Sequence, residues 1–204
     1  MKKLLIATTN PGKLAELSRF LSDIPITLVS LKDVGITDTI EEIGKTFEEN
    51  AILKAKYYFQ KSGLPTLADD GGAEIDALNG EPGVKTRRWI HGDRDSTDNE
   101  LVAYTLKRLE GVPKEKRGMQ LRLVLALVLP DGKIYTAEDK IRGVVADKPH
   151  SQSYEGFPFR RLMYVPDIGK FYNHDLMTDD ENEKYNHRKR ALEKLKPVIK
   201  QLID

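Results

Sequence analysis

The chain has 204 residues, of which 39% are hydrophobic and 32% are charged, and its formal net charge is +1. This composition suits a soluble globular protein whose core is formed by one compact domain or by one fold with two lobes. The near-neutral charge gives no global attraction to nucleic acid or to an anionic membrane, so an anionic ligand must be held locally. The lack of cysteine excludes disulfides, thiol catalysis and cysteine-bound zinc or iron–sulfur sites.

The N-terminal segment MKKLLIATTN has two lysines and an apolar run that is too short for a signal peptide. No run in the sequence approaches the roughly 18 consecutive apolar residues of a membrane span. We therefore expect a cytoplasmic protein with no membrane contact.

A polar loop joins the first two predicted elements, a buried strand over Leu4–Ala7 and a helix over Leu14–Leu21. This loop, residues 8–13 (TTNPGK), contains hydroxyls, an amide, a glycine and a lysine. Backbone N–H groups at a helix start favour an anion, so the loop can form a phosphate seat. The loop lacks the spacing of a Walker motif, and an Asn-Pro-Gly turn with a solvated Lys13 accounts for the same residues.

Capping signals and apolar runs predict the remaining elements. Threonine and glutamate three residues apart, the spacing of a capping box, open three helices. The most apolar run predicts a central strand covered on both faces, and a Pro-Asp-Gly turn joins it to a partner strand. Pro197 is expected to kink or interrupt the last helix. The predicted elements are a strand over residues 26–31, helices over 46–61 and 97–111, strands over 120–129 and 133–146, a short helix from Thr178 and a last helix from His187.

The stretch Leu67–Asp76 (LADDGGAEID) places Asp69 and Asp70 after a short apolar run and before a break at Gly71-Gly72. Along a strand the two side chains would point to opposite faces, so one carboxylate can face a cleft while the other holds the loop. A surface turn accounts for the same residues, because aspartate and glycine are common in turns. The alternative is a metal or general-base site.

Three other groups of charged residues also have two interpretations. Lys54 lies beside the apolar stripe of its predicted helix and can extend to solvent or along the stripe into a cleft, with Glu42 just ahead of the helix. The cluster Arg87-Arg88-Trp89 suits nucleotide or RNA binding, or a solvated loop packed on the tryptophan. His187 and Arg188 suit either salt-bridged structural residues or ligand contacts. The net charge does not support RNA binding, and we expect no nucleic-acid partner.

Four stretches taken together resemble the Ham1/RdgB family of inosine triphosphate pyrophosphatases: IATTNPGKLAEL, EEIGKTFEENAILKAK, LADDGGAEIDALNGEPGV and NHRKRALEKL. The resemblance covers nearly the whole chain, and its second and third stretches are the specific part. It implies a single α/β domain over residues 1–204, with a twisted mixed β-sheet, flanking helices and two lobes around a central active-site cleft, and usually a homodimer. The implied reaction is hydrolysis of the α–β phosphoanhydride of non-canonical purine triphosphates (ITP, dITP, XTP) to the monophosphate and pyrophosphate.

The resemblance also implies roles for individual residues. Asp70 matches the catalytic aspartate and Lys54 a lysine that contacts phosphate. Glu42 matches an acidic metal ligand, and Glu42 with Asp70 can provide the one or two carboxylates that Mg2+ prefers beside substrate phosphates. The implied substrate contacts are Thr8, Asn10 and Lys13 at the triphosphate, Gly71 beside the aspartate pair, Phe157 stacked on the base, Arg160 near the base, and His187 with Arg188 reading the purine.

The chain departs from the family pattern mainly near the base. The usual Ser-Gly-Leu after the aspartate pair is Gly-Gly-Ala at residues 71–73, so a hydroxyl that can touch phosphate is missing. The usual Gly-Phe-Gly-Tyr-Asp-Pro is GFPFRR at residues 156–161, which replaces an acceptor carboxylate with the donor Arg160. Asn182 and Asn186 stand where the family has a lysine and a serine.

These departures leave two alternatives open. One is a pyrophosphatase for an ordinary or modified nucleotide. Exchanging an acceptor for a donor near the base can leave a buried polar group without a partner, which costs about 1–3 kcal/mol, roughly a factor of 10 to 100 in base preference. The other is a nucleotide-binding protein that has lost catalysis. Retention of Glu42, Lys54 and Asp70 argues against the second, since a pure binder has less need of paired carboxylates beside a triphosphate.

Overall fold

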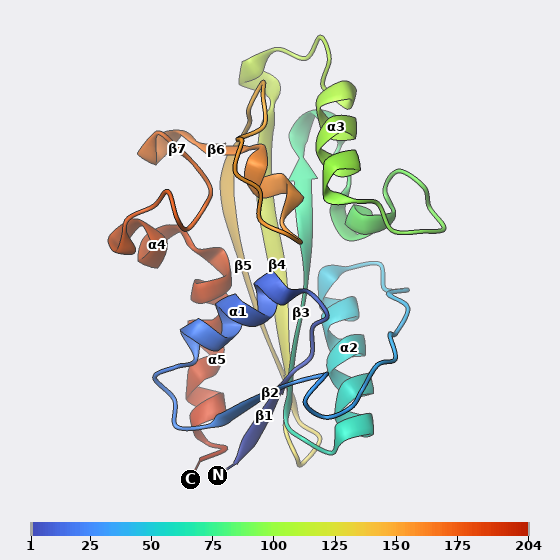
Figure 1. The fold of residues 1–204 in the computed structure, drawn as a ribbon, viewed down its shortest axis with the longest axis vertical. Helices are drawn as coiled ribbons and strands as arrows, with labels where there is room; N and C mark the ends of the chain where they lie inside the picture. The colour runs from blue at the N-terminus through green and yellow to red at the C-terminus, as the bar shows by residue number, and fades with distance from the viewer. Residues whose placement is uncertain (1, 204) are drawn as a thin grey trace. The chain divides into compact units, whose positions relative to one another are not determined.

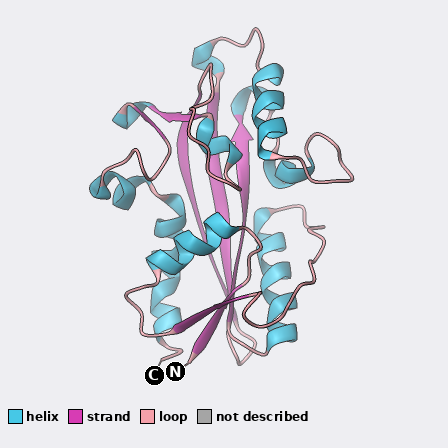
Figure 2. Ribbon diagram, in the orientation of Figure 1, coloured by secondary structure: helices cyan, strands magenta, loops and turns pink. Residues whose placement is uncertain are grey.

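The computed structural model describes residues 2–203, and contacts within the chain divide it into two compact units. Unit 1 comprises Met1–Asp70, Leu123–Asp139 and Arg188–Asp204, and unit 2 comprises Gly71–Arg122 and Lys140–His187. The long strands β3 (Thr66–Ile75), β4 (Gly118–Val128) and β5 (Ile134–Val145) contribute residues to both units (Figures 1 and 2).

Parallel strands form the first part of unit 1. β1 (Lys3–Ile6) pairs in parallel with β2 (Thr27–Ser30) and with β3. A parallel strand between two neighbours is covered on both faces, and Leu4, Leu5 and Ile6 are accordingly fully buried. The strand predicted from this apolar run is therefore confirmed.

Helices α1 (Pro11–Phe20), α2 (Phe47–Ser62) and α5 (His187–Lys200) flank the strands of unit 1. Leu17 of α1 and Leu192 of α5 pack in the same core as β1 and β4. Figure 1 shows α1 and α5 to one side of the strands and α2 to the other. The predicted start of α2 is confirmed, because Thr46 and Glu49 exchange the two hydrogen bonds of a capping box.

Unit 2 has its own core, which includes Ile75, Leu109, Met119 and Leu162. Its helices α3 (Asp98–Arg108) and α4 (Asp179–Tyr185) both begin at capping boxes that the sequence predicted. Its short strands β6 (Met163–Val165) and β7 (Lys170–Phe171) pair antiparallel with each other, and β6 pairs antiparallel with β5.

The seven strands follow the order β2-β1-β3-β4-β5-β6-β7, with parallel pairs at β1 and antiparallel pairs at β6. A mixed sheet with flanking helices confirms the predicted α/β class. Within residues 2–203, no helix combines the length and the apolar character needed to cross a membrane.

The break expected at Gly71-Gly72 is not found, and Pro197, expected to kink or interrupt the last helix, does not interrupt it. β3 continues from Thr66 through the predicted Gly71-Gly72 break to Ile75. β1 pairs only with Thr66 and Leu67 at the start of β3, whereas the neighbouring strand β4 supplies backbone hydrogen-bond partners on the other side, and this pairing outweighs the weak strand preference of glycine. Helix α5 runs through Pro197 to Lys200, and so close to the helix end the proline removes little of the hydrogen-bond ladder.

Candidate active site

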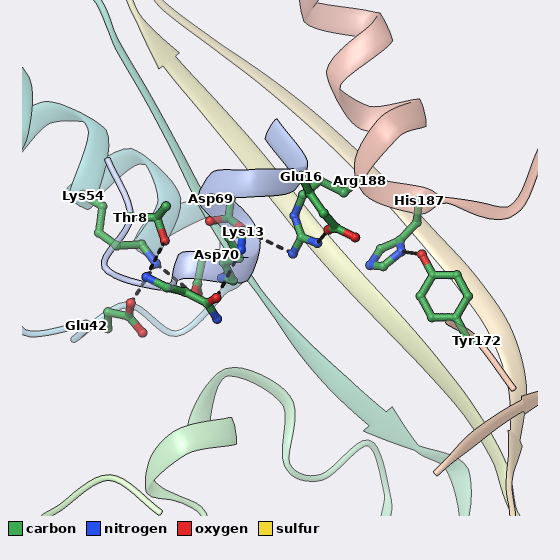
Figure 3. Close-up of polar contacts among 11 residues, drawn as sticks. Thr8, Lys13, Glu16, Glu42, Lys54, Asp69, Asp70, Tyr172, His187 and Arg188 are labelled. Atoms are coloured by element: carbon green, nitrogen blue, oxygen red, sulfur yellow. Dashed lines mark hydrogen bonds and ion pairs between the residues drawn. The ribbon is translucent and has the colours of Figure 1, made fainter. Parts of the chain in front are cut away.

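Asp69 and Asp70 follow one another on β3, so their side chains point to opposite faces of the strand, as the sequence predicted. Asp69 meets Lys13 and Arg188, whereas Asp70 meets Lys54 (Figure 3). Only 2% of Asp69 and 6% of Asp70 is exposed. Buried carboxylates need cationic partners to offset lost hydration, and each aspartate has at least one.

Lys54 projects from α2 between two carboxylates. Its ammonium lies 3.1 Å from Asp70 Oδ1 and 2.7 Å from Glu42 Oε1. Of the two orientations that the sequence left open for this lysine, the structure has the inward one. Burial by itself lowers the pKa of Lys54, but the carboxylates of Asp70 and Glu42 outweigh it and hold the pKa above its ordinary value.

The backbone next to Glu42 is fixed against α2 by a close approach at Gly44. The N–H of Gly44 donates to Asn50 Oδ1 at 2.7 Å. A β-carbon at Gly44 would lie 2.5 Å from the same oxygen, so a larger residue would displace the segment. Glycine at this position therefore holds the Glu42 segment beside the helix that carries Lys54.

One carboxylate oxygen of Asp70 accepts no hydrogen bond from the described residues. Oδ1 accepts from Lys54, whereas Oδ2 is buried without a partner. Burial raises the pKa of the Asp70 carboxyl above its usual value, which Lys54 opposes and the Glu42 carboxylate reinforces. A buried oxygen without a partner costs free energy that a bound cation or a water donor would recover.

Metal binding at this cluster would rest on two carboxylates. Residues 2–203 contain no group of three or more His, Cys, Asp or Glu side chains arranged to hold a metal ion. Glu42 and Asp70, joined through Lys54, are the carboxylates available here. Such a pair suits a cation like Mg2+, which keeps several waters and takes phosphate oxygens as further ligands.

The loop before α1 directs polar groups toward Asp69. Asn10 caps the helix, because its Oδ1 accepts from the Lys13 N–H at 3.1 Å, and its own N–H donates to Thr8 Oγ1 at 3.2 Å. The Lys13 ammonium lies 3.1 Å from Asp69 Oδ2. Within unit 1 the loop thus places Lys13 beside Asp69, and hydrogen bonds join Lys13 to Asn10 and Asn10 to Thr8.

Sequence reasoning missed Glu16, which lies in a buried ion network. Arg188 donates to Glu16 Oε2 at 2.6 Å and to Asp69 Oδ2 at 3.3 Å, and both Glu16 and Arg188 are buried. A signal was available, because Glu16 comes three residues after Lys13 and directly before Leu17 and so borders the buried face of the helix. The contacts of Arg188 correspond to the salt-bridged structural interpretation that the sequence left open.

The network makes stability sensitive to acid through Asp69. Burial by itself raises the pKa of Asp69, but Lys13, Arg188 and Lys54 outweigh it and lower the pKa from 3.8 to about 2. Because the folded-state pKa is depressed, the stabilisation is present above the unfolded-state pKa and is lost as pH falls toward 2. This contribution is on the order of 2 kcal/mol.

We therefore expect the free energy of unfolding to fall between about pH 4 and pH 2 by about 2 kcal/mol more in the wild type than in Asp69→Asn. Urea unfolding followed by circular dichroism from pH 2 to pH 5 measures how steeply the free energy of unfolding depends on pH in each protein. Asp69→Asn is less stable throughout, because it weakens the ion network, so the comparison concerns the slopes alone. Equal slopes in the two proteins would contradict this assignment.

Unit 2 holds the remaining predicted site residues. The Arg160 guanidinium lies over the Phe157 ring, 3.9 Å from its centroid, and 5.3 Å from the centroid of Tyr172. The Tyr172 hydroxyl is hydrogen-bonded to His187 Nδ1 at 2.8 Å (Figure 3). The structure therefore brings Phe157, Arg160 and His187 into one group, while Arg188 belongs to unit 1 and Gly71 lies on β3 directly after Asp70.

The basic cluster in the long loop has structural contacts. Arg87 pairs with Asp98 at 2.6 Å, and Trp89 Nε1 donates to Glu81 Oε2 at 2.9 Å. The Trp89 ring packs edge-on against Tyr104. The packing of Trp89 agrees with the predicted loop interpretation, and the structure adds the ion pair of Arg87.

Comparison with known proteins gives consistent matches along almost the whole chain. The model of the Ham1 family matches residues 4–198. A dITP/XTP pyrophosphatase of Thermus thermophilus is 40% identical over 198 residues, which cover 97% of this chain and 92% of the relative. The enzyme of the same name from Geobacter sulfurreducens is 40% identical over 196 residues, 96% of each chain. The solved structure of a HAM1 protein from Coxiella burnetii is 32% identical, with a TM-score of 0.82 over 98% of this chain and 100% of that one.

Proposed function

Because the chain belongs to the Ham1 family, we propose that it hydrolyses ITP, dITP and XTP to the nucleoside monophosphate and pyrophosphate. The observation that carries this proposal is the pairing of the consecutive carboxylates Asp69 and Asp70 with Lys13 and Lys54 inside one unit. Two buried carboxylates, each paired with a lysine and each with one oxygen that accepts no hydrogen bond from the described residues, suit hydrolysis of a polyanion.

Lys13 and Lys54 supply the positive charge for the triphosphate. Their present partners are carboxylates, at 3.1 Å in each case. Phosphate oxygens attract an ammonium in the same way, and charge-assisted hydrogen bonds of this kind are strong. Thr8 and Asn10, at the start of α1, add polar groups at a helix end that favours anions.

Asp70 acts as the general base. Its Oδ2 accepts a proton from the attacking water, while Lys54 holds Oδ1. The water oxygen bonds to the α-phosphorus while the bond from that phosphorus to the bridging oxygen breaks; the electron pair stays on the bridging oxygen, which leaves with pyrophosphate, where the lysines offset the new charge. Burial raises the pKa of Asp70, which makes its carboxylate a stronger base, and Lys54 opposes this shift.

Glu42 and Asp70 are the residues that would hold Mg2+. They fit the ion, because Mg2+ keeps several of its waters: the unpartnered Oδ2 of Asp70 could accept from a metal-bound water, and Glu42 adds a second carboxylate on the other side of Lys54. When bound, Mg2+ would neutralise phosphate charge and stabilise the leaving pyrophosphate.

Glu42→Gln is expected to raise the Mg2+ concentration for half-maximal activity by at least about 10-fold, because it removes an anionic ligand. Titration of Mg2+ at saturating dITP measures this shift. Glu41→Gln, an adjacent glutamate not assigned to the metal, is the matched control and should leave the midpoint unchanged. The same midpoint in Glu42→Gln and the wild type would exclude Glu42 as a ligand.

The remaining assignments belong to the same proposal. Phe157 and Arg160 would contact the base, and His187 and Arg188 would read the purine. Gly71 would lie beside the phosphates of the substrate. A homodimer and a cytoplasmic location stay predictions from the sequence.

The experiment that tests the proposed reaction is product identification by 31P NMR with dITP and Mg2+. We expect dIMP and pyrophosphate as the first products. Release of dIDP and orthophosphate would mean that the β–γ bond is cleaved and would refute the proposal, as would stable binding of dITP without turnover.

A further inference from the structure

The segment that carries Glu42 has no regular secondary structure of its own. Residues 36–44 form neither helix nor strand, and 41% of the Glu42 side chain is exposed. A glutamate on an irregular segment can adopt many conformations, and ordering it on binding weakens the affinity for any ligand that needs it. A metal ligand at this position therefore depends on residues that hold its segment in place.

Two buried side chains of α2 bond the backbone of this segment. Asn50 Oδ1 accepts from the Gly44 N–H at 2.7 Å, and the Tyr58 hydroxyl donates to the backbone carbonyl of Asp38 at 3.2 Å. Only 1% of Asn50 and 3% of Tyr58 is exposed, so both side chains are largely shielded from water. The segment is thus attached at two points to α2, beside which it runs (Figure 1).

The spacing of these residues on α2 places Glu42 between the two attachment points. Asn50, Lys54 and Tyr58 follow one another at four-residue intervals, so they lie on one face of the helix. Asn50 and Tyr58 are about 12 Å apart along the helix axis, with Lys54 midway. The segment runs in the opposite direction, and its Glu42 carboxylate lies 2.7 Å from the Lys54 ammonium. The two backbone bonds therefore fix the origin of the Glu42 side chain, and Lys54 fixes its carboxylate.

The ion pair of Asp38 with Lys61 does not take part in this arrangement. Both of its side chains are exposed, and an exposed pair contributes little. Tyr58 bonds the backbone of Asp38, so this bond persists when the Asp38 side chain is changed.

Resting on the proposed function, in which Glu42 is a metal ligand, we propose that Asn50 and Tyr58 are positioning residues that set the affinity of the site for a divalent cation. They act through the backbone, by holding the Glu42 carboxylate where it can bind the ion. Loss of a residue that orients a metal ligand typically weakens metal binding by about 10- to 100-fold.

Two variants test the proposal. Asn50→Leu keeps the size of the side chain and removes the acceptor, and Tyr58→Phe removes only a hydroxyl. Mn2+ is titrated into nucleotide-free protein, and electron paramagnetic resonance measures the free ion. We expect the dissociation constant to rise about 10-fold in Asn50→Leu and about 3-fold in Tyr58→Phe. The matched control is Tyr57→Phe, which should bind Mn2+ as the wild type does, because the Tyr57 ring lies against Tyr58 and Lys61 and both backbone bonds remain.

A double-mutant cycle separates positioning from a general loss of structure. If Asn50 acts through Glu42, Asn50→Leu should not weaken Mn2+ binding further once Glu42→Gln is present. Asn50→Asp keeps the acceptor oxygen and should bind Mn2+ at least as tightly as the wild type. Exchange of the Gly44 amide hydrogen in metal-free protein, measured by NMR, should be at least about 10-fold faster in Asn50→Leu and close to the wild-type rate in Asn50→Asp.

The wild-type affinity for Mn2+ in Asn50→Leu, or an equal loss with and without Glu42→Gln, would overturn the proposal, as would the absence of Mn2+ binding by the wild-type protein. These measurements need no nucleotide, so they are separate from the proposed reaction. If Mn2+ binding depends on Asn50 and Glu42 as expected but no triphosphate is hydrolysed, the reaction fails and the role of Asn50 stands. If the wild type releases pyrophosphate but Asn50→Leu binds Mn2+ equally well, the role of Asn50 fails and the reaction stands.

Discussion

Replacing Asp70 with asparagine is expected to reduce kcat for pyrophosphate release by about 10²- to 10⁴-fold. Asparagine keeps the size of the side chain and still accepts from Lys54 through its amide oxygen. It cannot take a proton from water at neutral pH, and it offers a neutral, weaker ligand to Mg2+. The loss should therefore fall on kcat, and steady-state kinetics with dITP would measure it.

The same variant should remain folded. Burial raises the pKa of Asp70, which means that the ionised carboxylate is less favourable in the folded than in the unfolded state. For such a group, stability decreases as pH rises through the folded-state pKa, and in this variant Glu42 still lies 2.7 Å from the Lys54 ammonium, so we expect the protein to remain folded at neutral pH.

Asp38→Asn is the matched control for Asp70→Asn. Asp38 pairs with Lys61 near the other end of α2, and both side chains are largely exposed. This change should leave kcat within about 2-fold of the wild type, because Asp38 has no assigned role in the reaction and an exposed ion pair contributes little to stability. A kcat near that of the wild type in Asp70→Asn, with the protein folded, would remove Asp70 from the mechanism.

Replacing Arg188 with methionine is expected to lower the free energy of unfolding by about 3–5 kcal/mol. The change leaves Glu16 buried without the cation that now lies 2.6 Å away, and it removes one of the cations near Asp69. Leaving a charge buried without its partner is costly, whereas loss of the pair as a whole costs less. Urea unfolding at neutral pH would measure the change.

Two further variants show whether the loss of stability comes from the buried ion network or from losing any arginine on α5. Glu16→Gln combined with Arg188→Met should recover part of the loss, because the unpaired charge is then gone. Arg190→Met removes a more exposed arginine whose partner Asp139 keeps Lys194 at 3.0 Å, so its cost should stay below about 1 kcal/mol. Equal losses in Arg188→Met and Arg190→Met would contradict this view of the network.

Local signals in the sequence were sufficient for most of the secondary structure. The capping boxes at Thr46, Thr97 and Thr178 predicted the starts of α2, α3 and α4, because a helix start depends on residues three positions apart. The continuation of β3 through Gly71-Gly72 was not predicted, because it depends on neighbouring strands that come from distant parts of the sequence.

The sequence named candidate site residues but did not give their pairing. The positions of Glu42, Lys54 and Asp70 follow from the family motifs, yet the inward orientation of Lys54 depends on where β3 lies against α2. The helix pattern could have indicated that Glu16 borders the buried face, but its partner Arg188 is 172 positions away, so the pairing itself could not be predicted. For the same reason the sequence could not separate His187, which bonds Tyr172, from Arg188, which bonds Glu16.

The most direct test of the proposed activity is pyrophosphate release by the wild-type protein from a panel of ITP, dITP, XTP, GTP, ATP and pyrimidine triphosphates with Mg2+. We predict kcat/KM for ITP, dITP and XTP at least about 10²-fold above that for ATP and GTP, with pyrophosphate rather than orthophosphate as the product. Equal or faster hydrolysis of ATP or GTP, or no pyrophosphate from any member of the panel, would contradict it.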